Sequence, residues 1–144
     1  LRLGYLCCPA KGEAPLLSES YQSAKMAYEM AGVGPEDIDF VELPDNSSWH
    51  YLQYLETMGF CKAGEADRLV ENGETNLSGK LPVCPSGGAS SFGEAVASQG
   101  LLQICELANQ LRGRSGERQV KDAKVGMSQT YGMLGNSAAA ILKI

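Results

Sequence analysis

The order of secondary-structure signals along this 144-residue chain predicts an α/β fold built in layers, with a mixed sheet packed by helices. Three observations favour this class. A helical pattern of apolar residues begins at Ser18, and a short apolar strand at 40–43 follows it. A second helical segment comes next. A longer one, about 94–112, precedes two strand-like stretches at the C-terminal end. Elements in this order bury their apolar faces against one sheet.

The whole chain, 1–144, is expected to form one domain, because 44% of its residues are hydrophobic and 20% are charged. Residues 1–17 read as an arm or strand followed by a loop. Ser18 caps a helix that ends at Gly32. The segment 60–80 is polar and has no period, so we expect a long surface loop there.

The loop 44–48 follows the strand 40–43 and caps a helix expected from Trp49 to Met58. In open α/β sheets, ligands lie beside loops at the carboxyl ends of strands. The long helix 94–112 has Gly100 inside it, which lets another backbone approach closely. Its apolar positions, Leu101 among them, predict a buried central helix. Strands are expected at 123–130 and 137–144, joined by a hairpin-like turn.

A glycine-rich turn, 85–88, follows a short strand expected at 81–83. Turns of this kind place backbone N–H groups around a ligand or a reacting oxygen. We therefore expect Ser86, Gly87 and Gly88 to contact the ligand.

Charge and cysteine usage exclude several classes of protein. The net charge is −5 and the isoelectric point is about 4.9, which argues against nucleic-acid binding. No apolar run approaches the ~20 residues that a membrane span needs, and no secretory signal is expected. The five cysteines and the one histidine lack metal-ligand spacing, so no metal site is expected. Because the number of cysteines is odd and the chain reads as cytosolic, we expect reduced thiols and a cytoplasmic location.

Several stretches carry a family resemblance, in the family's order, along nearly the whole chain. The first is Ala27-Tyr-Glu-Met-Ala-Gly-Val-Gly-Pro-Glu-Asp-Ile-Asp-Phe-Val-Glu-Leu, and the second is 55–65. The turn 81–88 with Pro-Ser-Gly-Gly comes next, then 110–120 and the closing glycine-bearing hairpin. In this series the chain resembles the C-terminal half of a thiolase. It is most similar to thiolases of the sterol-carrier-protein X type, also labelled lipid-transfer proteins.

The resemblance implies a layered half-fold that pairs with an N-terminal thiolase half or a second subunit, and homo-oligomers. Thiolases make or break a C–C bond next to a thioester, so acyl-CoA or CoA is the implied substrate, with no covalently bound cofactor. The N-terminal half supplies a nucleophilic cysteine. The C-terminal half supplies a histidine in a Gly-His-Pro turn and a second acid or base. Some relatives work with an OB-fold/zinc-ribbon protein that binds acyl-CoA, which implies such a partner here.

This sequence departs from the family at each of those positions. The Gly-His-Pro turn becomes Gly93-Glu94-Ala95, and the family's His-Asp-Cys-Phe loop becomes Pro44-Asp45-Asn46-Ser47. The late glycine turn carries Tyr131 and no cysteine, and Cys84 replaces an asparagine that often precedes Pro-Ser-Gly-Gly. An ionised Glu94 repels a developing oxyanion, so ordinary thiolysis by this half is not expected.

Four side chains are candidates for catalysis, and each has a structural alternative. Glu94 is an acid or base acting on a CoA ester, or a helix N-terminal acid. Asn46 donates to an oxyanion or caps a loop. Cys84 is a nucleophile or a buried, inert thiol. Tyr131 donates a hydrogen bond or proton, or simply packs. His50 is expected as a partly exposed helix residue.

We therefore expect the C-terminal domain of an enzyme that handles an acyl-CoA thioester with a degenerate acid/base set. The reaction would be acyl transfer, as in acetyl-CoA acetyltransferases, or retro-aldol C–C chemistry, and this domain alone would be inactive. The alternative is a non-catalytic subunit that binds lipid or acyl-CoA, or supports a separate catalytic half.

Overall fold

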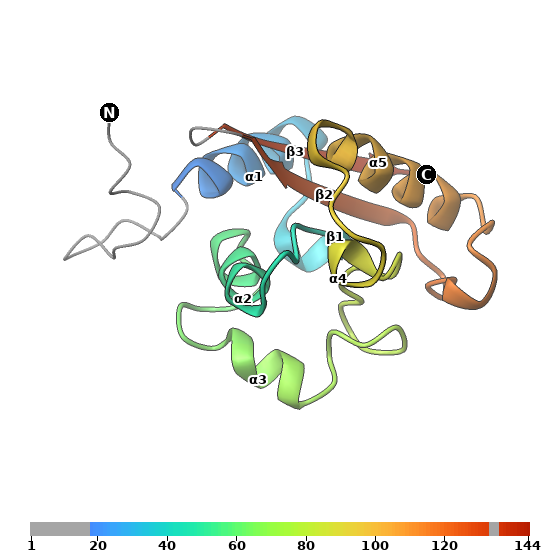
Figure 1. Cartoon of the computed structure of the whole chain (residues 1–144), viewed down its shortest axis with the longest axis horizontal. Coiled ribbons are helices and arrows are strands. Elements are labelled where there is room, and N and C mark those ends of the chain that lie inside the picture. The colour runs from blue at the N-terminus through green and yellow to red at the C-terminus, as the bar shows by residue number, and fades with distance from the viewer. Residues whose placement is uncertain (1–17, 133–135) are drawn as a thin grey trace.

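The computed structural model describes residues 18–132 and 136–144. The described chain forms short helices around one small sheet (Figure 1). In chain order the elements are α1 (Ser18–Ala31), η2 (Pro35–Asp37), β1 (Phe40–Glu42), α2 (Ser48–Thr57), α3 (Ala66–Glu71), α4 (Gly88–Phe92), η3 (Val96–Ser98), α5 (Gln99–Leu111), η4 (Gly116–Arg118), β2 (Val125–Tyr131) and β3 (Ser137–Lys143).

The three strands lie in the order β1-β2-β3, which confirms the predicted mixed sheet. β1 is parallel to β2, with Phe40 opposite Gly126. β3 is antiparallel to β2, with Ser137 opposite Tyr131. Gly126 is required by packing, because a Cβ there would lie 2.4 Å from the Phe40 ring. The antiparallel pairing thus brings the end of β2 and the start of β3 together at one end of the sheet.

Successive residues of β1 point to opposite faces of the sheet and meet different helices. Phe40 is buried in a cluster with Leu107 of α5. Val41 is buried in another cluster, with Ala24 of α1 and Leu55 of α2. The sheet therefore carries α5 on one face and α1 with α2 on the other (Figure 1).

The segment 60–80, expected to be a loop, contains the short helix α3. The Glu56 carboxylate of α2 accepts hydrogen bonds from the N–H groups of Gly64 (2.8 Å) and Ala66 (3.4 Å). A side chain of the preceding helix thus satisfies backbone donors just before and at the start of α3.

Two further expectations are corrected around the glycine-rich turn. The strand expected at 81–83 is a single bridge between Val83 and Val41. The helix expected from residue 94 begins at Gln99, because Gly93 and Val96 both have positive φ (86° and 48°) and interrupt any helix before it. A short helix, α4, occupies the turn's C-terminal side instead.

The expected arm 1–17 and the middle of the closing turn, 133–135, lie outside the described residues. Within the described ranges, no helix combines the length and the apolar character needed to cross a bilayer.

Candidate functional site

The end of β2, the start of β3 and the loop before η3 surround a cavity of about 540 Å³. Its described lining is Glu94, Val96, Ala97, Gly100, Thr130, Tyr131, Gly132, Asn136, Ser137 and Ala138. The Tyr131 hydroxyl donates a hydrogen bond to Glu94 Oε1 at 3.3 Å. Two of the four predicted catalytic side chains therefore meet at one cavity, although 37 residues separate them.

Tyr131 is held in its protonated form at neutral pH. Partial burial raises the pKa of its phenol, and the negative charge and hydrogen bond of Glu94 raise it further. A protonated phenol is a hydrogen-bond donor, so Tyr131 is equipped to stabilise negative charge that develops on an oxygen in the cavity.

Glu94 does not start a helix, so its helix N-terminal interpretation is wrong. It precedes η3, and α5 begins five residues later at Gln99, whose side chain accepts the Ala95 N–H at 3.1 Å. Gly100 then brings α5 close to β2, because a Cβ there would lie 3.3 Å from Thr130. This close approach places the start of α5 in the cavity wall, beside Tyr131.

The Asn46 segment reaches the same place through a different residue. Asn46 is exposed and is not among the described residues that line the cavity. Four residues further on, the His50 ring lies 6.1 Å from the Tyr131 ring, centroid to centroid. The structure therefore brings the segments around 46, 94 and 131 together, with His50 rather than Asn46 facing Tyr131.

The glycine-rich turn does not present free amides. The N–H and hydroxyl of Ser86 donate to Glu42 at 2.9 and 2.8 Å, and the Gly87 N–H donates to the Cys84 carbonyl at 2.8 Å. The Gly88 N–H donates to the Ser86 hydroxyl at 3.1 Å. Contact of Ser86, Gly87 and Gly88 with a ligand stays a prediction. It requires that hydrogen bonds to the ligand replace these internal hydrogen bonds.

Asp45 completes this internal cradle. Its carboxylate accepts the N–H groups of Ala89 (2.7 Å) and Ser90 (3.3 Å) and the Ser90 hydroxyl. A Cβ on Gly88 would lie 2.2 Å from Asp45 Oδ2, so only glycine fits. The anion that the turn cradles is thus a carboxylate of the protein itself.

Sequence reasoning missed Glu42, a buried acid whose raised pKa is typical of a functional residue. Only 2% of its surface is exposed, and burial raises its pKa from the usual 4.5 to about 7. The Ser86 hydrogen bonds pull the pKa down, and the charges of Glu106 and Asp45 push it up. The available signal was an acid inside an otherwise apolar strand, directly before the loop 44–48.

Cys84 is a buried thiol. Its Sγ donates to the Leu43 carbonyl at 3.3 Å, and its backbone takes the unusual φ of 51°. Burial raises the pKa of the thiol well above its usual range, and the Glu42 charge raises it further. A thiol that resists ionisation is a poor nucleophile, which favours the inert interpretation.

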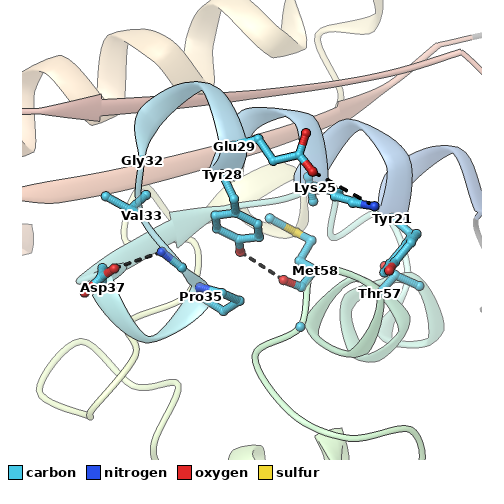
Figure 2. A pocket seen from close by; sticks show the side chains of 13 residues that line it. Tyr21, Lys25, Tyr28, Glu29, Gly32, Val33, Pro35, Asp37, Thr57 and Met58 are labelled. Atoms are coloured by element: carbon cyan, nitrogen blue, oxygen red, sulfur yellow. Dashed lines mark hydrogen bonds and ion pairs between the residues drawn. The ribbon is translucent and has the colours of Figure 1, made fainter.

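A second cavity, of about 550 Å³, lies between α1 and the end of α2 (Figure 2). Its polar groups bond to each other. The Tyr28 hydroxyl donates to the Met58 carbonyl at 2.9 Å, and the Asp37 carboxylate accepts the Gly34 N–H at 2.8 Å. These bonds connect helices and turns, so the described residues that line this cavity show no converging reactive groups comparable with the Glu94–Tyr131 pair. No group of three or more potential metal ligands occurs in the described part of the chain.

Comparison with known proteins agrees with the layered fold. The chain belongs to the thiolase C-terminal domain-like family, which matches residues 10–143.

Two curated relatives are each 38% identical to this chain. Sterol carrier protein 2 of Rattus norvegicus matches over 125 residues, which are 87% of this chain and 23% of that protein. Acetyl-CoA acetyltransferase of Methanothermobacter thermautotrophicus matches over 123 residues, 85% and 32% of the two chains. The chain thus spans about a quarter to a third of the length of these relatives.

A solved structure of an Ltp2-ChsH2(DUF35) aldolase is also similar. It superposes with a TM-score of 0.75 at 29% identity, covering 87% of this chain and 31% of that one. The family and the layered fold are therefore established for this chain, and the matched region is one part of each longer relative.

Proposed function

We propose that this chain supplies acid/base and hydrogen-bonding groups for C–C bond or acyl-transfer chemistry on an acyl-CoA thioester. The observation that carries the proposal is the Tyr131–Glu94 hydrogen bond beside a cavity of about 540 Å³. A carboxylate and a protonated phenol in contact give one proton acceptor and one donor at the same place. The thioester would lie in this cavity.

The retro-aldol form of this chemistry suits the residues best, because it requires no cysteine nucleophile. Glu94 would take the proton from the β-hydroxyl of a β-hydroxyacyl-CoA. The Cα–Cβ bond then breaks, leaving a carbonyl compound and the enolate of the shortened thioester. Tyr131 would donate to the enolate oxygen, and a proton delivered to Cα completes the reaction. Donors of this kind contribute about 3–4 kcal/mol to such transition states.

The remaining candidates have smaller parts in this proposal. Asn46 would donate to the substrate only after its exposed loop closes on the cavity. Cys84 takes no part, because its thiol is buried against Leu43. Ser86, Gly87 and Gly88 would contact CoA only through groups now bonded internally.

The proposal is tested with the full chain in the assembly that it forms, using β-hydroxyacyl-CoA and acyl-CoA substrates. Tyr131→Phe and Glu94→Gln should each lower kcat/KM by about 100-fold or more. Tyr21→Phe is the matched control, because Tyr21 is an exposed tyrosine of the other cavity. Full activity in both site variants would overturn the proposal.

A second candidate function, a binding or scaffold subunit, rests on apolar residues of α5 that are exposed although Leu107 and Leu111 on the same helix are buried. Leu101 is 69% exposed and Cys105 is exposed, whereas Gln103 and Gln110 are buried. The expected burial of Leu101 is therefore not met in the isolated chain. We propose that this face packs against an N-terminal thiolase half or a second subunit, in a homo-oligomer or with an acyl-CoA-binding OB-fold/zinc-ribbon partner.

The two functions separate experimentally. Leu101→Glu should abolish co-purification with the partner while leaving the fold of the chain intact, because the side chain faces solvent. If Leu101→Glu abolishes assembly and the Tyr131 and Glu94 variants leave activity unchanged, the chain is a scaffold. If those two variants abolish activity within an intact assembly, it is part of the catalytic site.

A further inference from the structure

The chain has a single histidine, and it lies against the proposed catalytic tyrosine. His50 is half-buried in the first turn of α2. Its ring centroid lies 6.1 Å from that of Tyr131, with the planes inclined by 33°. Its centroid also lies 6.4 Å from that of the buried Tyr54, with the planes inclined by 40°. The imidazole thus lies near two phenol rings that belong to different elements.

Ser47 fixes the orientation of this imidazole. The Ser47 hydroxyl accepts the His50 backbone N–H at 3.2 Å and lies 3.1 Å from Nδ1. Since the hydroxyl oxygen already accepts the amide, its own proton is available to Nδ1. Donation of that proton to Nδ1 would leave the proton of the neutral imidazole on Nε2. The Ser47 hydroxyl that caps the helix is therefore also the hydrogen-bond partner of the ring.

We propose that His50 is a positioning residue for Tyr131, which holds the phenol ring toward Glu94 and whose charge adjusts how readily the phenol gives up its proton. The contact itself is independent of any reaction. Its catalytic consequence rests on the proposed function above.

The charges around the ring support this role. Glu94 acts on Tyr131 from the loop before η3, and its negative charge favours the protonated phenol. A protonated imidazole acts in the opposite direction, because a positive charge stabilises a phenolate. Among the described residues, the further titratable neighbours are Tyr54 on α2 and Glu19 on α1, whose charge reaches Tyr54. A change in the charge of the imidazole therefore alters the balance that Glu94 sets at the phenol.

The test follows the Tyr131 ring by NMR in the full chain, labelled with ¹³C at the tyrosine ζ carbon. Tyr131→Phe identifies the signal. In the wild type this signal should shift as the pH rises from about 5 to 8, the range in which histidine titrates. The shift should disappear in His50→Gln and persist in Glu94→Gln. The Tyr28 signal, from the cavity in Figure 2, is the internal control and should stay constant in all variants.

A Tyr131 signal that is constant over this range in the wild type, or that shifts equally in His50→Gln, would overturn the proposal. His50→Asn is the second variant should the first fail to fold. Kinetically, His50→Gln should lower kcat about 10-fold with an unchanged KM and remove one limb of the pH profile. An assembly with no turnover would refute the proposed function alone, because the NMR signal would still show or exclude the contact.

Discussion

Two polar regions of this molecule differ in whether their polar groups are already hydrogen-bonded within the protein. Both the glycine-rich turn and the Tyr131–Glu94 cavity come from segments expected to bind substrate. In the turn, Glu42 and Asp45 occupy the amides and hydroxyls. In the cavity, the hydrogen bond that joins Tyr131 to Glu94 is exposed. Polar groups bonded within the protein stabilise the fold, and those left open are available for chemistry.

The difference is also electrostatic. The turn buries carboxylates, and burial raises the pKa of Glu42 to about 7. Arg118, at 2.8 Å from Glu106, places one positive charge beside these acids. The cavity keeps Tyr131 41% exposed. Substitutions should therefore damage stability at the turn and activity at the cavity.

The largest effect on stability is expected from Gly88→Ala. The new Cβ would lie 2.2 Å from Asp45 Oδ2, in a residue whose φ is +63°. Strain and the broken carboxylate cradle together should lower the free energy of unfolding by about 4 kcal/mol, measured in urea. Gly113→Ala is the matched control, because its φ is +66° and nothing lies within 4 Å of the new Cβ. It should cost only about 1 kcal/mol, and equal costs would show that the cradle contributes nothing.

The next effect is the pH dependence of stability caused by Glu42. Its pKa rises from 4.5 to about 7 on folding, so between these values the folded chain keeps a proton that the unfolded chain releases. The free energy of unfolding should therefore fall by about 3 kcal/mol as the pH rises through this window, and stay low above it.

Glu42→Gln removes this titration. Its stability relative to the wild type should improve by about 3 kcal/mol between pH 4.5 and pH 8, measured by urea unfolding across that range. The exposed Glu117→Gln serves as the control substitution. Parallel curves for Glu42→Gln and the wild type would mean that Glu42 titrates alike in both states.

The smallest effect on stability is expected at the cavity. Tyr131→Phe removes an exposed hydrogen bond and should cost about 0.5 kcal/mol, even though it abolishes most of the proposed activity. Tyr28→Phe should cost more, about 1–2 kcal/mol, because the carbonyl of the buried Met58 loses its donor. Thermal unfolding of both variants makes this comparison. A larger loss of unfolding free energy for Tyr131→Phe than for Tyr28→Phe would show that Tyr131 mainly stabilises the fold.

Sequence reasoning predicted the helices that start at residues 18 and 48–49 to within a residue, as well as the pairing of the last two strands. It placed Glu94 and Tyr131 at one site through the family resemblance. It could not find the role of His50, since the contact with Tyr131 joins residues 81 positions apart. It also placed Leu101 and Cys105 in the interior, whereas α5 buries Leu107 and Leu111 and leaves those two exposed, because helical spacing alone does not say what covers each face.

The sequence by itself determined the family, the mixed sheet and the residue types carried at the strand ends, since periodicity, turn residues and motif order are local properties of the chain. Only the tertiary structure decided which of those residues are free. The sheet register and the packing of α5 on β2 bring Glu42 and Asp45 to the glycine-rich turn and bring Glu94 and His50 to Tyr131. Hydrogen-bond satisfaction depends on such long-range contacts, so the reactive and structural acids of this chain become distinguishable only in the folded state.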